Sequence, residues 1–579
     1  MVKEFKTLLP YFKKYSLFYA AGFFFLILTN GAQLFIPQLI RIALDDLSSR
    51  NTTVIHLALT AFTVALGRVG WRFFIIGASR RIERDLRDKI FHHLTTLSDS
   101  FFSRNRTGDL MARSTNDLEA VRMSTGMAFV AFVDGVFLTT TILIILFLTN
   151  PWLGFYTFIP LPVITLLILS FGGMVSRLFK NVQEAYSQIT NQVQEALSGI
   201  RVIQAFVKEQ NFSEKFHLKN TEYLQRNLEL TKLWGLFFPI IALLSGLTTL
   251  ILLWYGGGQV MEGHLTPGEF ASYLSYLSML VWPMLGAGMT VNIIQRGAAS
   301  LGRINEVLQE KPEITSPPEA QAPPPPYVLE VRNLNFHYPK RDNPVIKKIS
   351  FTLKPGQILG ILGSTGVGKT TLLKLLPRLL DPPEGTIFLG GKDIKLWPLV
   401  ELRKKFAMVP QSTFLFSETI KNNIAFSNPE TPLEEILLMG EMTTLTRDVE
   451  GFDQGWDTLV GERGVSLSGG QKQRVSLARA LTAPAPILLL DDCMASVDME
   501  TEEKILGHLL KEAKGRSIIL VSHRISTLKN ADVILVMEKG TILQRGTHEE
   551  LLKVEGTYSE IATLQHQKDR ISGETIEKK

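Results

Sequence analysis

The chain has 579 residues, more than one hydrophobic core normally accommodates, so we expect at least two structural units. Its 45% hydrophobic and 20% charged residues are unevenly distributed, because an apolar first half precedes a half with the composition of a soluble domain. The net charge of +6 does not indicate a nucleic-acid-binding surface, since two long blocks, 123–176 and 233–295, contain no Lys or Arg.

Six apolar segments are long enough to cross a bilayer, which takes about 20 apolar residues. We predict spans at roughly 17–40, 55–77, 125–148, 152–175, 233–258 and 270–293. The N-terminal MVKEFKTLLPYFKKY is typical of an amphipathic entry helix rather than a cleavable signal peptide, so the first span is expected to stay in the protein. Because the number of spans is even, both chain ends are expected on one side of the membrane.

Basic residues indicate which side that is. The segment joining the second and third spans (the first inside segment) is rich in Arg, and the segment joining the fourth and fifth spans (the second inside segment) is rich in Lys, so both are expected in the cytoplasm. Their helical spacing of apolar residues predicts long helices that extend past the membrane. At the tips, 98–121 and 206–216 carry polar turns flanked by aromatic residues, which either meet a partner domain or form a solvated hairpin.

Three charged residues fall within the predicted spans, where charge is costly: Arg68, Arg72 and Asp134. Structural pairing or snorkelling is the favoured interpretation, and a substrate role is the alternative. Four apolar residues are candidates for helix packing or, alternatively, for an adaptable binding wall: Met279, Trp282, Met284 and Met289.

A Pro-rich linker, 311–326, separates the transmembrane domain, 1–310, from a soluble domain, 327–579. In the soluble domain the short apolar runs ILGILG, ILLLDD and SIILVSH alternate with helical stretches, which predicts buried parallel strands. The expected fold is therefore an all-α six-helix transmembrane domain followed by an α/β nucleotide-binding domain.

The nucleotide site is predicted by GxxxxGK[ST], formed by Gly363, Gly368, Lys369 and Thr370 between an apolar strand and a helical pattern. Backbone N–H groups and the helix N-terminus attract phosphates, Lys369 reaches the β and γ phosphates, and Thr370 offers a hydroxyl to Mg²⁺. Five neighbours complete the expected ATP- or GTP-binding loop: Ser364, Thr365, Gly366, Val367 and Thr371. Asp491, at a strand end, is the expected Mg²⁺ carboxylate, with a helix-capping role as the alternative.

The motif LSGGQKQR, 467–474, resembles the signature of the ABC (ATP-binding cassette) ATPases, and six spans followed by one cassette resemble an exporter-type half-transporter. The tip sequence FFSRNRTGDLMARSTND is similar to a coupling segment of that class. The resemblance implies that two cassettes sandwich two ATP molecules, so each site combines one chain's phosphate loop with the other chain's signature. It also implies a multi-pass protein of the inner (plasma) membrane, with the ATP-binding domain and both termini in the cytoplasm.

The resemblance assigns further roles residue by residue. Tyr338 is expected against adenine, where stacking is physically sensible, Gln411 at Mg²⁺ and the γ-phosphate, and His523 at the γ-phosphate. Contacts with the γ-phosphate on the opposite subunit are expected from the signature residues Ser468, Gly469, Gly470 and Gln471. Glu462 and Arg463 are expected in a loop that contacts the coupling helices, and Asp498 is expected in a loop that links the two ATP sites.

One position departs from the family pattern, because Asp492 stands where a Glu normally polarises the attacking water. A base must lie within about 2.6–3.2 Å of the proton it takes, and one methylene shortens the reach by roughly 1.3 Å. We therefore predict a weak ATP site on this chain and a heterodimer whose partner has the catalytic Glu, with a homodimer as the alternative. The neighbouring Cys493, the only cysteine, is interpreted as an apolar filler in a protein facing a reducing compartment.

The expected function is ATP-driven export of amphipathic small molecules, drugs or lipids, by alternating access, with catalysis involving Asp492, His523 and Gln411 and with ATP and Mg²⁺ as cofactors. Peptides are a less favoured substrate, since no peptidase domain precedes the spans. An ATP-gated channel or regulator of the same fold is the rival hypothesis. A soluble ABC ATPase of DNA repair is excluded by the six spans.

Overall fold

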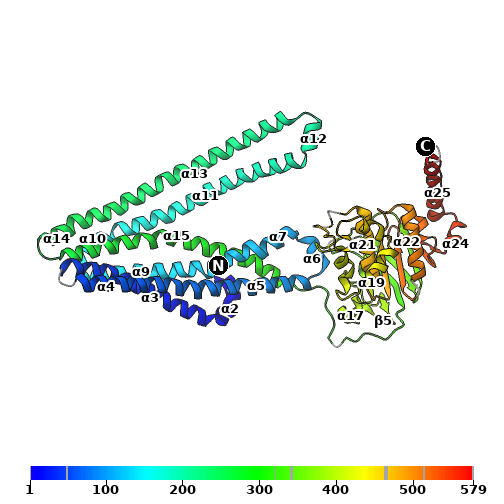
Figure 1. Ribbon diagram of the computed structural model, residues 1–579, viewed down its shortest axis with the longest axis horizontal. Coiled ribbons are helices and arrows are strands. Elements are labelled where there is room, and N and C mark those ends of the chain that lie inside the picture. The colour runs from blue at the N-terminus through cyan, green and yellow to red at the C-terminus, as the bar shows by residue number, and fades with distance from the viewer. Residues whose placement is uncertain are drawn as a thin grey trace. The chain divides into compact units, whose positions relative to one another are not determined.

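A computed structural model describes residues 2–46, 50–318, 320–339, 343–461, 464, 467–512 and 515–576. The chain divides into two compact units (Figure 1). The first comprises Met1–Thr95 and Arg106–Glu310, and the second comprises Thr96–Asn105 and Lys311–Lys579. A short piece of the first inside segment therefore belongs to the same unit as the soluble domain.

The first unit is helical. Its principal helices are α3 (Ser16–Asp45), α4 (Arg50–Trp71), α5 (Gly77–Thr96), α7 (Thr107–Ala112), α8 (Leu118–Thr125), α9 (Met127–Thr149), α10 (Pro151–Phe158), α11 (Pro160–Ser198), α12 (Ile200–Ala205), α13 (Glu209–Ile251), α14 (Gly257–Met261) and α15 (Pro267–Gln309). Short π-helical stretches at Arg72–Ile76, Arg113–Asp117 and Leu252–Gly256 join several of them into continuous rods. Six rods in the described part of the chain are long and apolar enough to cross a membrane, which confirms the predicted number of spans.

The N-terminal entry segment differs from the expected single helix. It forms three short pieces, α1 (Val2–Phe5), a 3-10 turn (Lys6–Leu8) and α2 (Leu9–Lys14). Pro10 lies in the first turn of α2, where its missing N–H is tolerated, and it cannot continue a helix from the preceding turn. The buried Leu8 anchors the break against the helical core.

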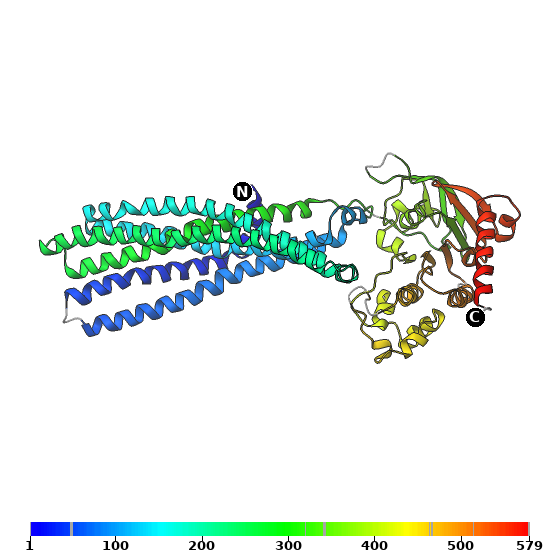
Figure 2. The same ribbon diagram turned by 90° about the horizontal axis from the view of Figure 1, so that it is seen from above.

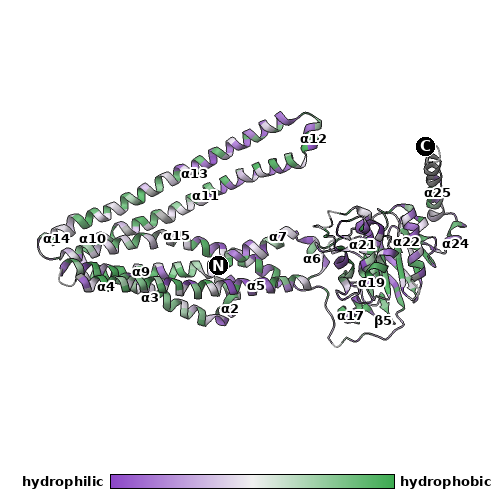
Figure 3. Cartoon of the chain, in the orientation of Figure 1, coloured by the Kyte–Doolittle hydropathy of each residue, from purple (hydrophilic) through white to green (hydrophobic). Residues whose placement is uncertain are grey.

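Helices α11 and α13 pack along each other as a long hairpin with α12 at its tip (Figures 1 and 2). Hydrophobic residues gather toward the α10 and α14 end of the hairpin, and hydrophilic residues toward α12 (Figure 3). The gradient is typical of helices that leave the hydrocarbon layer for water. The expectation that the second inside segment forms long helices extending past the apolar region therefore agrees with the structure.

The charged residues of the spans lie in two settings. Arg68 and Asp134 both line a cavity of about 360 Å³ within the first unit, together with Asn30, Met279 and Trp282. The guanidinium of Arg72 instead lies over the ring of Trp71, 5.5 Å from its centroid. Of the other two candidates for a binding wall, Met284 packs against the helical core and Met289 is exposed.

The second unit contains two sheets. An antiparallel sheet has the order β2 (Ile346–Leu353), β1 (Leu329–Phe336), β4 (Ile387–Leu389), β5 (Lys392–Asp393). The larger sheet has the order β10 (Thr541–Gly546), β9 (Val533–Glu538), β3 (Ile358–Gly363), β8 (Ser517–Val521), β7 (Ile487–Asp491), β6 (Phe406–Val409). The three predicted strands β3, β7 and β8 pair in parallel, as expected, with β8 in the middle.

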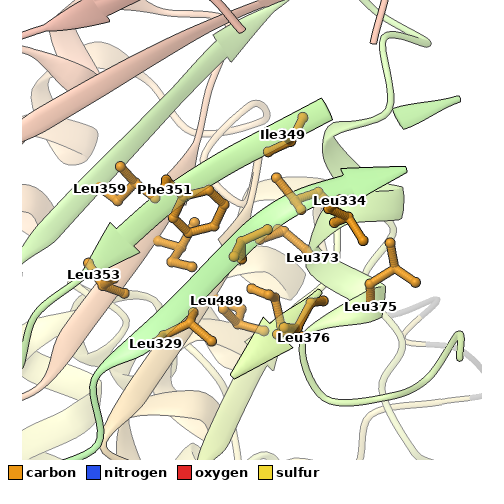
Figure 4. Close-up of a cluster of buried hydrophobic side chains, with 14 of the residues drawn as sticks. Leu329, Leu334, Ile349, Phe351, Leu353, Leu359, Leu373, Leu375, Leu376 and Leu489 are labelled. Atoms are coloured by element: carbon orange, nitrogen blue, oxygen red, sulfur yellow. The ribbon is translucent and has the colours of Figure 1, made fainter. Parts of the chain in front are cut away.

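A buried apolar cluster fixes the helix that follows β3 (Figure 4). Leu373 and Leu375 of α16 (Lys369–Leu375) pack with Leu334 and Phe351 of the small sheet and with Leu489 of β7. The cluster thus holds the N-terminus of α16 at the carboxyl edge of the parallel strands. Ligands bind at this edge in open α/β sheets.

Candidate nucleotide-binding site

The loop from β3 to α16 is shaped by glycines. Gly366 and Gly368 have φ of +82° and +107°, in the left-handed region that other residues rarely adopt. A Cβ on Gly363 would lie 2.7 Å from the carbonyl oxygen of Met537, too close for any side chain. The glycines therefore permit a tight loop, of the kind whose successive N–H groups can bind an anion.

Lys369 closes this loop from inside. Its Nζ donates to the carbonyl oxygens of Gly363 at 2.7 Å and Ser364 at 2.9 Å, and the side chain is largely buried. Burial lowers the pKa of Lys369, although the nearby carboxylates of Asp492 and Asp491 oppose the shift. The ammonium is thus fixed where an anionic ligand would compensate for its desolvation.

A cavity of about 210 Å³, the phosphate cavity, brings most of the predicted nucleotide residues together. It is lined by Tyr338, Val345, Thr365, Gly366, Gly368, Lys369, Thr370, Thr371, Gln411, Asp491, Asp492 and His523. The hydroxyl of Tyr338 lies 3.0 Å from Oγ1 of Thr371, which ties the aromatic residue to the first turn of α16. Val345 was not anticipated from the sequence, since it belongs to no motif.

Asp491 and Thr370 fit a divalent cation. Asp491 is buried at the end of β7, and its Oδ2 makes no hydrogen bond to the part of the chain that is described. Burial raises the pKa of Asp491, the charge of Asp492 raises it further, and a hydrogen bond from Thr370 opposes both. A desolvated carboxylate oxygen beside a hydroxyl and the Gln411 side chain forms the all-oxygen donor set that Mg²⁺ prefers.

Asp492 has an unusual backbone. Its φ is +46°, a conformation that Asp and Asn adopt more readily than Glu, and its N–H donates to the carbonyl oxygen of Val521 at 3.0 Å. Its side chain lines the phosphate cavity. The next residue, Cys493, is buried, and burial raises the pKa of its thiol to about 12, so it is an unreactive apolar side chain.

His523 follows β8 and reaches the same cavity. Its Nε2 lies 3.4 Å from Nζ of Lys369, so two groups that are far apart in sequence meet because β3 and β8 are neighbours. His523, Lys369 and both aspartates therefore line one cavity.

The signature residues lie elsewhere in the second unit. Ser468 caps α21 (Gly469–Thr482), accepting from the N–H of Gln471 at 3.3 Å, while Oε1 of Gln471 accepts from the N–H of Ser468 at 2.9 Å. Ser468 and Gly469 are exposed, and the phosphate cavity is lined by other residues. A Cβ on Gly470 would lie 2.9 Å from the carbonyl oxygen of Ser496, so the signature packs closely on the segment that leads to Asp498.

Asp498 is exposed and accepts from the N–H of Thr501 at 2.9 Å, a bond that lowers the pKa of its carboxyl group. It precedes α22 (Met499–Glu512). Glu462 and Arg463 lie outside the described residues.

The piece of the first inside segment that belongs to the second unit makes specific pairs that no sequence motif marked. Asp99, on α6 (Asp99–Arg104), forms a 2.8 Å ion pair with Lys374 of α16. Glu313 accepts from Ser98 at 2.9 Å, from Ser100 and from Arg104 at 3.1 Å. The only local signal was Lys374 itself, a single basic residue in the apolar run LLKLL.

The predicted tip 98–121 is therefore divided: residues 98–105 lie in the second unit and 106–121 in the first. The ion pair joins α6 to the helix that begins with Lys369.

The chain resembles known proteins over nearly its whole length. Residues 19–284 match the ABC transporter transmembrane region and residues 346–495 match the ABC transporter family. The probable multidrug resistance ABC transporter ATP-binding/permease protein YheI of Bacillus subtilis (strain 168) is 38% identical over 569 residues, 97% of each chain. The multidrug resistance-like ATP-binding protein MdlA of Escherichia coli (strain K12) is 36% identical over 572 residues, again 97% of each.

Two further similarities concern lipid transport and fold. The ATP-dependent lipid A-core flippase of Syntrophus aciditrophicus (strain SB) is 32% identical over 579 residues, 98% of this chain and 96% of that protein. A solved structure of a bacterial Atm1-family ABC exporter with ATP bound superposes with a TM-score of 0.77 and 25% identity, covering 96% of this chain and 98% of the other. The chain thus belongs to the ABC transporter family, as a multi-pass, exporter-type half-transporter of the multidrug or lipid class that binds ATP and couples its hydrolysis to transport.

Proposed function

We propose that this chain is one subunit of a heterodimeric ABC exporter, that its own ATP site hydrolyses slowly, and that its signature completes the active site of its partner. The observation that carries the proposal is the separation of Ser468 from the phosphate cavity. Ser468 and Gly469 are exposed at a helix N-terminus, whereas Lys369, Asp491 and His523 line one cavity. A signature that is to touch a phosphate therefore needs the nucleotide of a second chain.

The helix start at Ser468 suits that task. α21 has 14 residues, and its N-terminal N–H groups and partial positive charge attract anions. The capping box uses Ser468 and Gln471 to rigidify this end before any phosphate arrives. In the proposed dimer, these groups close over the γ-phosphate held by the partner's phosphate loop.

The weak-site proposal rests on the side chain of Asp492. It lines the cavity but is one methylene shorter than the Glu that normally polarises water in this family. Loss of a well-placed base costs about 10²–10⁴ in rate.

Mg²⁺ is proposed at Asp491, Thr370 and Gln411, where it would neutralise the phosphates and the buried carboxylate. ATP is proposed to stack on Tyr338. We further propose residues 327–579 as the cytoplasmic nucleotide-binding domain and both termini as cytoplasmic, supported by the basic inside segments and an even number of spans.

Transport is proposed to follow alternating access in the inner membrane, with amphipathic drugs or lipids as substrates. ATP favours the closed pair of cassettes through its higher affinity for that state, and α6 passes the movement to the transmembrane helices. The names of the relatives, multidrug resistance for YheI and lipid A-core flippase for the Syntrophus protein, support this substrate class.

The test is ATP turnover of this chain purified alone and co-expressed with a second ABC half-transporter of the same organism, both reconstituted in vesicles. The expected result is low turnover alone, high turnover with a partner that has Asp-Glu at the corresponding positions, and ATP-dependent accumulation of an amphipathic dye. A stable dimer of this chain alone with full turnover would establish the homodimer instead. Passive flux opened by a non-hydrolysable ATP analogue would favour the channel.

A further inference from the structure

The side chain of Gln565 holds the backbone of the loop that carries His523. Gln565 lies on α25 (Thr557–Ile576), the last helix of the chain. Its Nε2 donates to the carbonyl oxygen of His523 at 2.7 Å, and its Oε1 accepts from the N–H of Ile525 at 2.9 Å. A carboxamide is suited to this position because it offers a donor and an acceptor side by side.

The face of α25 that bears Gln565 is otherwise apolar. Tyr558 is fully buried, and Ile561 and Ala562 pack against the core of the larger sheet. Gln565 follows these residues at helical spacing, two turns after Tyr558, so it lies on the packed face rather than toward solvent. Its amide therefore lies at the end of this apolar stripe, where α25 passes the loop.

The loop between β8 and α23 (Ile525–Leu528) is held from its other side as well. Oγ of Ser522 accepts from the N–H of Arg524 at 3.0 Å, and the guanidinium of Arg524 pairs with the buried carboxylate of Glu502. With the loop ends fixed in this way, the peptide after His523 is oriented by Gln565.

The ring of His523 points into the phosphate cavity, with Nε2 at 3.4 Å from Nζ of Lys369. Its backbone carbonyl points to α25. The carbonyl and the imidazole share one Cα, so rotation of the peptide after His523 would displace the ring. A displacement of about 1 Å is enough to lose a hydrogen bond to a ligand.

We propose that Gln565 is a positioning residue that aims His523 at the γ-phosphate, so that the last helix of the chain sets how strongly this site prefers ATP over ADP. The inference rests on the proposed role of His523 at the γ-phosphate. ADP lacks that phosphate, so a displaced imidazole weakens the binding of ATP and leaves the binding of ADP unchanged.

The test uses the full transporter and photolabelling of this chain with an azido-ATP analogue at low temperature, displaced by ATP or by ADP. Gln565→Met keeps the length and helix propensity of the side chain but removes both hydrogen bonds. Gln567→Met is the matched control, because Gln567 lies on the same helix and is exposed. The expected loss of ATP affinity in Gln565→Met is about tenfold, the effect of losing the hydrogen bond from His523 to the charged γ-phosphate, with ADP affinity retained.

Three outcomes are decisive. Support requires that Gln565→Met lowers the preference for ATP and has no further effect when combined with His523→Ala, as two residues acting through one contact should behave. If His523→Ala alone lowers that preference and Gln565→Met does not, or if Gln565→Met weakens ATP and ADP equally, the positioning role is wrong and that of His523 stands. If His523→Ala leaves the preference unchanged, the proposed role of His523 itself fails.

Discussion

The phosphate cavity encloses its functional groups, whereas the signature segment of the same domain exposes its own. Lys369 is largely buried and already bonded to two carbonyl oxygens, and His523 and Asp491, at the ends of the neighbouring strands β8 and β7, line the same cavity. Ser468 and Gly469 are exposed, and the hydroxyl of Ser468 accepts from the N–H of Gln471 at the start of its own helix. The contrast teaches that the phosphate-loop residues are enclosed together while the signature is left open at the surface, which is the arrangement that the proposed pairing with a second chain requires.

The largest expected effect comes from placing a negative charge on the signature. Ser468→Asp keeps an effective N-cap on α21 but sets a carboxylate against the partner's γ-phosphate. We expect ATP turnover of the complex to fall at least about 100-fold, as on loss of a transition-state donor, while ATP still labels this chain. Thr547→Asp, at the capping box of α24 (His548–Leu552), is the control. Unchanged turnover would show that the exposed signature does not serve a second site.

The second effect concerns the cavity. Asp492→Glu restores the missing methylene and is expected to raise ATP turnover at this chain's own site about 10- to 100-fold. Measurement requires a partner whose catalytic Glu is replaced by Gln, so that the ATP turnover measured comes from this chain's own site. A flat response would mean that the partner's signature or the backbone at φ +46° also limits the reaction.

A smaller effect is expected at the ion pair between Asp99, in the first inside segment, and Lys374 of α16. Asp99→Lys opposes Lys374 and should lower substrate transported per ATP several-fold. Combining it with Lys374→Asp should restore the ratio, because the ion pair re-forms with its charges exchanged. The pair is partly exposed, so its contribution to stability is below about 1 kcal/mol.

The exposed pair Glu401 and Lys404 on and beside α17 (Leu399–Arg403), reversed in the same way, is the control for that exchange. If the exchanged Asp99 and Lys374 variant stays uncoupled, electrostatic pairing is not the basis of the contact.

The smallest effect concerns stability without ligands. Burial raises the pKa of Asp491 in the folded state above its unfolded value, so its ionised form opposes folding at neutral pH and its protonated form does not. Asp491→Asn is therefore expected to stabilise the nucleotide-free protein by about 1 kcal/mol near pH 7, the scale of one unsatisfied buried acceptor. The gain should shrink as pH falls through the raised pKa. Thermal unfolding at several pH values without Mg²⁺ checks this, and a gain that grows in acid would contradict it.

Sequence patterns predicted the spans, the parallel strands and the residues of the phosphate loop, because each of these depends on local spacing. The meeting of His523 with Lys369 depends on strand order, which the family resemblance implied and the pairing of β3 with β8 explains. Gln565 was missed because its partner lies 42 residues away and no motif marks it. The division of 98–121 between two units was also missed, since helical spacing does not reveal which neighbour a short helix contacts.

The most direct test of the proposed asymmetry is to locate trapped nucleotide in the mixed complex. Vanadate and azido-ATP under turnover conditions trap ADP at the site that hydrolyses, and gel separation of the two chains shows which phosphate loop holds it. The expected result is label mainly on the partner, lost when Ser468 of this chain becomes Asp, with ATP bound but not trapped on this chain. Equal trapping on both chains, or trapping mainly here, would contradict a weak site at Asp492.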